Sequence, residues 1–543
     1  MAISGASQST IETPVLIVGG GPVGLALAGG LGARGVPCLL IEEKTTGSEE
    51  PRALTLDVRT MEFMRRYGLT DQVREAAMPE ELQKVLYCTS LSGYEIARLD
   101  KPAPSSSGSP ERGVRIDQLQ LDPILRDFAA SHADTRLRFR WRLERLKQRG
   151  DCILAEVADL AALNRRTIAA QYVIDCTGSN STIRDGNDLR LEGTGPTDHY
   201  AQIYTRIPGL AHHTEGDETG ETMFVDASGI WRTLESIDGR GLYRLLLRGE
   251  EHWENADTID ATAELEQIAG RPVVHQLFST ARWQARNAVA NRWREGNILL
   301  AGDAAHQSRS TNGAGLVLGL ADAFDLSWKL EARLAGWATT GIIDSYEAER
   351  RSLTKRGVAD AEAIDDAEKQ ERPYEFHPDI ALDTPAGRAA RKALGATIDA
   401  RHARTRTPDG LASAPVYAGS PIVAGDDAQT SGAPAAVHRT GVTPGARAPH
   451  ARMQNGSSTL DLYGKGFVLL RLGQRAPDPG GIDRAFVHRG VPLTYRTIDD
   501  PAFMRLHDCR LVLVRPDGHV AWRGDKPPDD PLAVVDRIRG ATL

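Results

Sequence analysis

Apolar residues follow two different patterns along the chain, and each pattern predicts a different kind of element. Near the N-terminus, the short apolar runs at 15–18 and 38–41 flank a stretch of glycine, alanine and leucine at 25–31. Short apolar runs on both sides of a small-residue helix are typical of parallel strands that are buried on both faces. A further apolar run, at 298–300, ends directly before Gly302 and Asp303. These runs predict strands of an α/β sheet.

The middle of the chain alternates apolar and polar residues with a period of two. The alternation runs through "YAQIYTRIPGL" from Tyr200, "ETMFVDASGIWRTLES" from Glu221 and "GLYRLLLRGEEHW" from Gly241. This period indicates antiparallel strands with one buried face. Farther on, the segment 342–370 predicts one long helix whose charged residues face solvent, and the segment 423–441 has the composition of a linker.

Three glycines after the first predicted strand have the spacing of a dinucleotide-binding turn. Gly19, Gly21 and Gly24 form GxGxxG between that strand and the following helix. The first glycine permits a tight turn, and the second lets the backbone approach a pyrophosphate at the helix N-terminus. The third lets the helix pack closely on the strand. The motif therefore predicts a nucleotide site at this turn.

Two acidic positions at strand ends specify the nucleotide further. Glu42 ends the second predicted strand 18 residues beyond Gly24, where a carboxylate can bind ribose hydroxyls. Asp303 follows the buried run at 298–300, and a carboxylate there needs a hydrogen-bond partner, for which a polyol held over the sheet is one candidate. GxGxxG alone does not distinguish FAD from NAD, and the distant pair Gly302 and Asp303 decides for FAD.

The composition limits the classes of partner and cofactor. A chain of 543 residues is long enough for two or three domains, and a net charge of −8 argues against a nucleic-acid or anionic-membrane partner. The first residues lack the basic and apolar regions of a signal peptide, and no apolar run has the length of a membrane span. The five cysteines are scattered without CxxC or metal-ligand spacing, so we expect a reduced cytoplasmic protein without a metal site.

Four stretches together resemble the single-component, FAD-dependent aromatic hydroxylases, the class A flavoprotein monooxygenases. They are the GxGxxG unit, "PRALTLDVRTMEFMRRYGL" from Pro51, "DCTGSNSTIR" from Asp175 and "GNILLAGDAAH" from Gly296. Stretches that begin at 382, 444 and 511 resemble the subgroup with an additional C-terminal domain, which is a thioredoxin-like fold without redox cysteines. Within the family, the chain most resembles phenol hydroxylases and the tailoring hydroxylases of aromatic polyketides.

This resemblance implies an α/β fold in three parts. A Rossmann-like FAD-binding domain would comprise residues 1–185 and 280–375, with an antiparallel-sheet substrate domain inserted at 186–279. A helical connection and linker would follow at 376–439. The thioredoxin-like domain at 440–543 would either cap the FAD-binding domain or form the face of a homodimer.

The resemblance also implies which residues meet FAD. Asp303 would hydrogen-bond the ribityl chain, Arg52 would meet the cofactor after a mobile loop, and Gln118 would lie beside the flavin. The helix that follows Asp303 would bring its positive N-terminal end to the ring and stabilise negative charge on the reduced flavin. The predicted cofactor contacts are completed by Pro22, Val23, Glu43, Thr177, Gly178, Gly302, Gly313, Ala314 and Gly315.

Three positions depart from the family pattern. Thr177 replaces an aspartate near FAD and the path of the nicotinamide cofactor, Arg309 and Ser310 replace a pair of prolines, and Val317 replaces an asparagine near the flavin. One explanation is that other groups cover the lost contacts. A second is a cyclase or rearrangement catalyst that retains FAD without turning it over, and a third is a non-enzymatic scaffold with a vestigial flavin.

The main functional expectation is an aromatic hydroxylase that uses FAD, NAD(P)H and O2. The resemblance implies that a phenolic, polycyclic polyketide-type substrate attacks a flavin hydroperoxide, since no side chain activates oxygen by itself. Phe224, Trp231 and Tyr243 are candidates for the substrate walls, although strand aromatics more often belong to the core. The sequence does not identify the phenol base, and the candidates for a catalytic role are His306 and Arg309.

Overall fold

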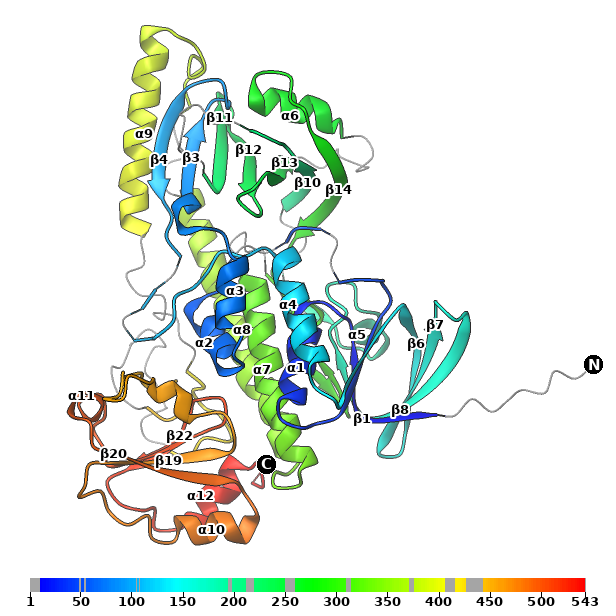
Figure 1. Cartoon of the computed structure of the whole chain (residues 1–543), viewed down its shortest axis with the longest axis vertical. Helices are drawn as coiled ribbons and strands as arrows, with labels where there is room; N and C mark the ends of the chain where they lie inside the picture. Colours follow the sequence, from blue (N-terminus) through cyan, green and yellow to red (C-terminus); the bar gives the residue numbers. More distant parts are fainter. Residues whose placement is uncertain are drawn as a thin grey trace, which may run out of the picture.

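The computed structural model of the protein describes residues 10–47, 50–52, 55–103, 105–106, 108–193, 198–210, 219–249, 259–308, 314–370, 376–405, 416–425 and 443–542. Figure 1 shows three parts, with the N-terminal strand in the central one. A large sheet with two helices lies above this central part, and a small C-terminal α/β part lies below it.

The central part is built on a largely parallel sheet, as the apolar runs predict. Its strand order is β16-β17-β8-β1-β2-β5, and the hairpin of β6 and β7 continues from β8. β1 pairs in parallel with β2 and β8, and β8 pairs in parallel with β17. The strands are β1 (Ile11–Val18), β2 (Cys38–Glu42), β5 (Thr135–Phe139), β6 (Trp141–Arg149), β7 (Cys152–Asp159), β8 (Asn164–Asp175), β16 (Arg294–Glu295) and β17 (Ile298–Leu300).

Both faces of the second half of β1, at residues 15–18, are buried, which explains why this part of its sequence is continuously apolar. Val15 and Ile17 pack with the central helices in the main core, whereas Leu16 and Val18 pack toward the hairpin of β6 and β7. The helices of this part are α1 (Pro22–Gly32), α2 (Val58–Arg66), α3 (Thr70–Ala76), α4 (Gln118–Ala130), α5 (Thr182–Gly186), α7 (Ala314–Leu334) and α8 (Gly341–Gln370).

The second sheet is larger than the alternating segments predict. Its order is β14-β10-β13-β12-β11-β3-β4. The strands are β3 (Lys84–Cys88), β4 (Glu95–Asp100), β10 (Asp198–Arg206), β11 (Glu221–Asp226), β12 (Gly229–Ser236), β13 (Leu242–Gly249) and β14 (Gln276–Ala285). β3 and β4 lie within the range predicted for the FAD-binding domain, and β11 pairs with β3 in parallel. The sheet therefore contains both parallel and antiparallel pairs. β3 and β4 join it from a part of the chain that precedes the inserted segment.

Two helices cover different parts of this sheet. α6 (Ala261–Ala269) packs on one face through Leu265 and Ile268. α9 (Pro385–Thr405) packs beside β4 through Leu394 and Ile398, although its sequence falls in the predicted connection at 376–439. Residues 406–415 of this connection, and residues 426–441 of the predicted linker, lie outside the described residues.

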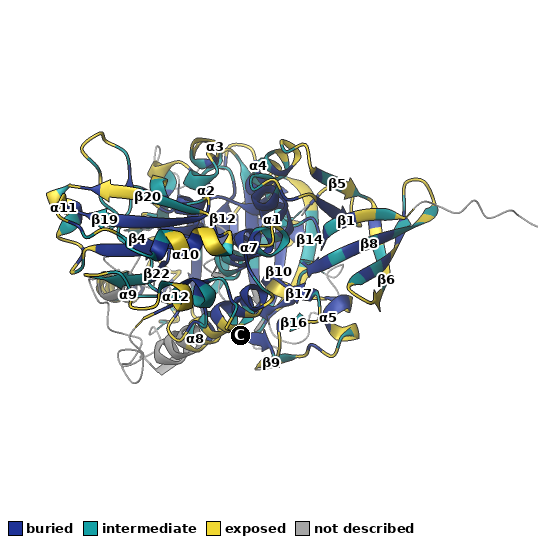
Figure 2. Ribbon diagram, turned by 90° about the horizontal axis from the view of Figure 1, so that it is seen from below, coloured by how far each residue is buried: buried dark blue, intermediate teal, exposed yellow. Residues whose placement is uncertain are grey.

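The C-terminal part is a separate small α/β unit with the strand order β20-β19-β21-β22. β19 pairs in parallel with β20 and antiparallel with β21, as in a thioredoxin-like fold. Figure 2 shows β19 buried and β20 largely at the surface. The elements are β19 (Phe467–Leu472), β20 (Leu493–Ile498), β21 (Leu511–Val514), β22 (Val520–Gly524), α10 (Ile482–Arg489), α11 (Pro501–Met504) and α12 (Pro531–Ile538).

Short elements complete the chain. A three-stranded sheet has the order β18-β15-β9. Its strands and the 3-10 turns are β9 (Leu191–Gly193), β15 (Ala288–Ala290), β18 (His306–Gln307), η1 (Glu80–Leu82), η3 (Gly302–Ala304) and η4 (Thr459–Leu462).

The long helix at 342–370 forms as predicted, but two of its charged residues do not face solvent. Glu349 and Arg350 are buried on α8. Glu349 pairs with Lys329 of α7 at 2.7 Å and with Arg515 of the C-terminal part. Burial alone would raise the pKa of the Glu349 carboxyl, but the charges of Arg515 and Lys329 outweigh it and hold the pKa below its usual range. An ionic contact therefore joins the C-terminal part to the central helices.

Candidate active site

The first and third glycines of GxGxxG are required by the packing of the chain on itself. Gly19 has a φ of +111°, and a Cβ on it would lie 2.3 Å from the carbonyl oxygen of Cys176. A Cβ on Gly24 would lie 2.1 Å from the carbonyl oxygen of Gly19. Glycine is needed at both positions for β1, β8 and α1 to meet, independently of any ligand.

Gly21 differs, because no contact with the described part of the chain explains its missing side chain. A Cβ on Gly21 would meet no described protein atom within 4 Å. Gly21 is also the N-cap of α1, and the helix begins without a side-chain cap. Its first N–H groups and its positive end are therefore available to an anion. Open space beside a bare helix N-terminus fits the pyrophosphate of a dinucleotide.

Glu42 holds the turn that carries these glycines. Its Oε2 accepts a hydrogen bond from the Gly20 amide at 2.6 Å, and its Oε1 accepts one from the Lys44 amide at 2.8 Å. The half-buried carboxylate therefore stands beside the nucleotide turn, at the position predicted for ribose binding, with exposed Glu43 next to it.

Asp303 lies at the second predicted anchor, in the turn η3 directly after β17. Its side chain is exposed to solvent, although burial among protein atoms raises the pKa of its carboxyl, against the opposing charges of His306 and Arg52. The carboxylate is therefore accessible to a ligand, although protein atoms surround it. Gly315, at the start of α7, leaves room beside it, since a Cβ there would lie 3.9 Å from Asp303 Oδ1.

The structure brings η3 directly against the nucleotide turn. Gly302 has a φ of +63°, and a Cβ on it would lie 3.0 Å from Val23 Cγ2. A Cβ on Gly319 of α7 would lie 2.7 Å from the same Val23 methyl group. Two stretches nearly three hundred positions apart in the printed sequence thus form one cleft wall, and their groups fit the pyrophosphate and polyol of FAD.

Thr177 takes part in a local hydrogen-bond network at the end of β8. Its hydroxyl and its amide donate to Asp175 Oδ1 at 2.7 and 3.0 Å, and Ser181 donates to Asp175 Oδ2. Asp175 is fully buried, so these donors compensate its loss of water. Gly178 follows with a φ of +88° and open space where a Cβ would stand. The acid of this segment therefore lies at Asp175, and not at the cleft surface.

His306 lies in a buried ionic network away from solvent. Its Nε2 lies 2.8 Å from Asp322 Oδ2, and Arg350 donates to Asp322 Oδ1 at 2.8 Å. The Gly302 amide also donates to Asp322, at 3.1 Å, which links the network to the turn that carries Asp303. These contacts support a positioning role for His306.

The other predicted cofactor contacts lie around this cleft or outside the described residues. Gln118 is buried at the N-terminus of α4, where its Nε2 donates to Asp122 Oδ2 at 3.3 Å. Arg52 is exposed and close enough to Asp303 to lower the pKa of that carboxyl. Ala314 begins α7, and Val317 is half-buried on it. Arg309 and Gly313 lie outside the described residues.

The aromatic residues predicted for the substrate walls lie in the core beneath α6. Phe224 is fully buried, 6.2 Å from Trp231 between ring centroids, and both pack in one cluster with Tyr243 and α6. Arg232, directly opposite Phe224 in the sheet, forms an ion pair with Glu264 of α6. Figure 1 shows α6 on the part of the sheet farthest from α1 and α4. Phe224 and Tyr243 therefore face away from the nucleotide cleft.

The opposite face of the sheet meets the central part. Residues directly across two antiparallel strands share a face, so Arg244 lies with Glu235 and with Tyr204. Arg244 donates to the Pro51 carbonyl at 3.2 Å, and Gln202 donates to Glu50 at 3.3 Å. Sequence reasoning did not select this face for the substrate. The alternating pattern does show that its residues point to the side opposite Phe224 and Tyr243. Which face meets the cofactor depends on α6, and alternation does not reveal that.

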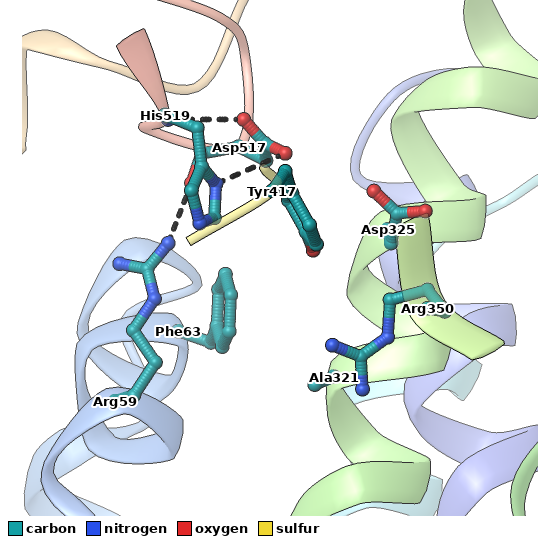
Figure 3. Close-up of a pocket in the computed structure, with 8 residues that line it drawn as sticks. All are labelled: Arg59, Phe63, Ala321, Asp325, Arg350, Tyr417, Asp517 and His519. Atoms are coloured by element: carbon teal, nitrogen blue, oxygen red, sulfur yellow. Dashed lines mark hydrogen bonds and ion pairs between the residues drawn. The ribbon is translucent and has the colours of Figure 1, made fainter. Parts of the chain in front are cut away.

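A cavity of about 20 Å³ lies elsewhere, between the central helices and the C-terminal part. Figure 3 shows Arg59 and Phe63 of α2 on one side, facing Tyr417 and His519. Arg59 donates to the Asp517 carbonyl at 2.8 Å across this contact. Such a volume holds about one water molecule, and not a flavin or an aromatic ring system.

Two kinds of site are absent from the part of the chain that the structure describes. No group of three or more His, Cys, Asp or Glu residues there could hold a metal ion. Within the same residues, no helix combines the length and apolar character that crossing a membrane requires.

Comparison with known proteins agrees with this geometry. Residues 12–361 match the model of the FAD binding domain family, which spans more than half of the chain. Residues 442–541 match the aromatic-ring hydroxylase C-terminal family. The chain belongs to the FAD-dependent aromatic hydroxylases. FAD is accordingly the cofactor, and the α1 N-terminus at Gly21 and the carboxylate of Asp303 have the chemistry to hold it.

The similarity extends over whole chains. Tetracenomycin B2 monooxygenase-dioxygenase from Streptomyces olivaceus is 29% identical, with 98% of this chain and 99% of that protein covered. The substrate-free rebeccamycin biosynthetic enzyme RebC has a TM-score of 0.85 at 33% identity, covering 98% of this chain and all of that one. Aklavinone-11 hydroxylase in complex with FAD and aklavinone has a TM-score of 0.79 at 26% identity, covering 98% and 99%.

Proposed function

We propose that this FAD-dependent monooxygenase hydroxylates a polycyclic, phenolic substrate of polyketide type, with NAD(P)H as electron donor. The observation that carries the proposal is that the turn of exposed Asp303 packs against Val23, beside the uncapped N-terminus of α1, where groups suited to the polyol and the pyrophosphate of FAD come together. The Arg244 side of the second sheet contacts the neighbouring segment at Pro51. Full-length similarity to hydroxylases named for tetracenomycin and aklavinone supports the polycyclic class of substrate.

Bound FAD supplies the electron transfer and oxygen activation that no side chain provides. The chain would hold the cofactor through the α1 N-terminus at its pyrophosphate and through Asp303 at its ribityl chain. A charge-assisted hydrogen bond of the latter kind contributes about 1.5–3 kcal/mol. The second sheet would cover the site and exclude water, which protects reactive species from hydrolysis.

Residues at the junction of the sheet and the central part would orient the substrate. Arg244 and Glu235 form a buried ion pair, with Arg244 Nη2 2.5 Å from Glu235 Oε2. Gln202 lies on the same face. These polar groups replace Phe224, Trp231 and Tyr243 in our proposal for the substrate walls, because they lie on the face toward the cofactor.

The test is turnover of the purified holoenzyme with a panel of polycyclic phenols under isotopically labelled O2. We expect NADPH or NADH to be consumed only with substrate, and the product to carry one labelled oxygen atom. A product formed without the nicotinamide and without label would contradict the proposal.

A second function remains a candidate because of two observations. The fold is also close to that of RebC, and Thr177 replaces the acid that the family carries. A tailoring enzyme that retains FAD without turning it over would convert its substrate in the absence of NAD(P)H. The labelling experiment therefore separates the two functions.

A further inference from the structure

A group of ionisable side chains, all of them buried except Lys101, lies where the second sheet meets the segment before α4. We refer to these residues as the Arg115 cluster. They come from three strands of the sheet, from the end of β4 and from the segment that leads into α4. The members are Lys101, Arg115, Asp117, Glu221, Glu235 and Arg244.

The ion pairs of the cluster are unevenly distributed. Lys101 Nζ lies 2.7 Å from Glu221 Oε2 and thus makes a close ion pair. Arg115 approaches the same oxygen only to 3.6 Å, through its Nη2. Arg244 is paired closely with Glu235. Arg115 is therefore the cation with the weakest contact to an acid.

Two donors of Arg115 have no hydrogen-bond partner among the described residues. Its Nε and Nη1 are both buried and unbonded, and the side chain is only 5% exposed. Oδ2 of Asp117, two residues along the same segment, is likewise buried and unbonded within the described chain. Buried donors without partners are unfavourable, and more so when the group is charged. Such groups are expected to meet a ligand or water.

The charges of the cluster favour an additional anion. Lys101, Arg115 and Arg244 are cationic, whereas Glu221 has a pKa held below its usual range by Lys101 and Arg115, although burial opposes this. Burial raises the pKa of the Asp117 carboxyl to about 7, against the Leu119 amide and Arg244, so it is only partly ionised near neutral pH. Three cations thus face two fully paired acids, and buried charges without partners are unfavourable.

The cluster also lies beside two predicted cofactor contacts. Asp117 is the N-cap of α4 and accepts from the Leu119 amide, directly before Gln118. Arg244 donates to the carbonyl of Pro51, directly before Arg52. A ligand held by the cluster would therefore lie between the sheet and the cofactor cleft.

We propose that Arg115 binds an anionic oxygen group, in particular a carboxylate, on the aromatic substrate, through its two unpaired N–H groups. The inference rests on the proposed function in one respect, which is that the ligand is the aromatic substrate. It defines the substrate class more closely, as an aromatic ring system that carries an acidic group. Asp117, when protonated, donates a further hydrogen bond to the same group.

The test compares two probes that differ only in charge, a hydroxynaphthoic acid and its neutral carboxamide. Their binding to the holoenzyme is measured by titration of the flavin absorbance spectrum, without NAD(P)H. We expect the acid to bind more tightly than the amide, and Arg115→Gln to weaken the acid by about tenfold or more while leaving the amide within about twofold. Arg112→Gln is the matched control, because Arg112 lies in the same segment but its side chain is 70% exposed.

A second variant changes the affinity in the opposite direction, and it decides the question if Arg115→Gln does not fold. Glu221→Gln removes the acid that competes for Arg115, so the acid probe should bind several-fold more tightly. Equal weakening of both probes by Arg115→Gln, or weaker binding of the acid to Glu221→Gln, would overturn the proposal. Loss of NADPH affinity in Arg115→Gln with unchanged binding of the acid would also overturn it.

These outcomes are independent of turnover. Charge-selective binding that depends on Arg115, without labelled product, would leave this inference standing and remove the hydroxylase function. Labelled product without charge-selective binding would support the hydroxylase function and overturn this inference.

Discussion

At the scale of single residues, the glycines and acids around the nucleotide turn are the best-determined part of the site. Gly19 and Gly24 are fixed by contacts within the chain, whereas Gly21 and Asp303 face open space. Ligand binding therefore depends on the second pair more than on the first. Substitution of the first pair disrupts the fold, so it does not test the site.

Asp303→Asn provides that test. Loss of the negative charge should raise the dissociation constant for FAD roughly ten- to hundredfold, because one charge-assisted hydrogen bond is weakened by about 1.5–3 kcal/mol. The measurement is titration of the apoprotein with FAD, followed by flavin fluorescence. Asp188→Asn is the control, since Asp188 is exposed at the surface beside Arg190. Equal FAD affinity in both variants would contradict the role given to Asp303.

Residue chemistry also explains what the sequence predicted and what it did not. The places of the three glycines, Glu42 and Asp303 could be predicted, because a glycine-rich turn between a strand and a helix and an acid at a strand end both leave a local pattern. The substrate walls could not, because Phe224 and Tyr243 share a face whose direction depends on the later helix α6. Arg115 and Glu221 lie far apart in sequence, and only the fold brings them together.

At the scale of elements, the helix α8 shows how a periodic pattern can mislead. Its many charges favour a solvated surface, and the helix forms over the predicted range. Glu349 and Arg350 are nevertheless buried, because the C-terminal part brings Arg515 onto this helix and α7 supplies Lys329. The burial arises from a contact with a distant segment, which a local pattern does not contain.

Glu349→Gln should therefore destabilise the protein. The change leaves Arg515 and Lys329 buried with less negative charge, and breaking a buried ion pair in this way costs about 3–5 kcal/mol. The measurement is the midpoint of thermal unfolding of the holoenzyme, which we expect to fall clearly. Lys355→Gln, at an exposed position of the same helix, should leave it unchanged. The same midpoint in both variants would show that the ionic contact does not hold the C-terminal part.

At the scale of the whole molecule, the cofactor site and the second sheet are built from the same segments of the chain. Segments from before and after the inserted strands build the cleft, and β3 and β4 carry the same early part of the chain into the sheet. The three-part fold was predictable from motifs that resemble a known family. Its internal boundaries were less so, because β3, β4 and α9 join the second sheet from outside the predicted range.

In the proposed arrangement, the Arg244 side of the second sheet would cover a substrate site over FAD, as an aromatic hydroxylase requires. The central claim is that the flavin is turned over there, and not merely retained. Thr177 donates to Asp175 and adds no negative charge at the cleft, so we expect reduction of the flavin to be slow without substrate.

The most direct test is to mix the holoenzyme with NADPH or NADH under anaerobic conditions, with and without a polycyclic phenol, and to follow the absorption of the oxidised flavin. The account predicts that the band disappears much faster with the phenol, and that admission of air restores it together with a hydroxylated product. A band that stays oxidised while the substrate is still converted would contradict the account.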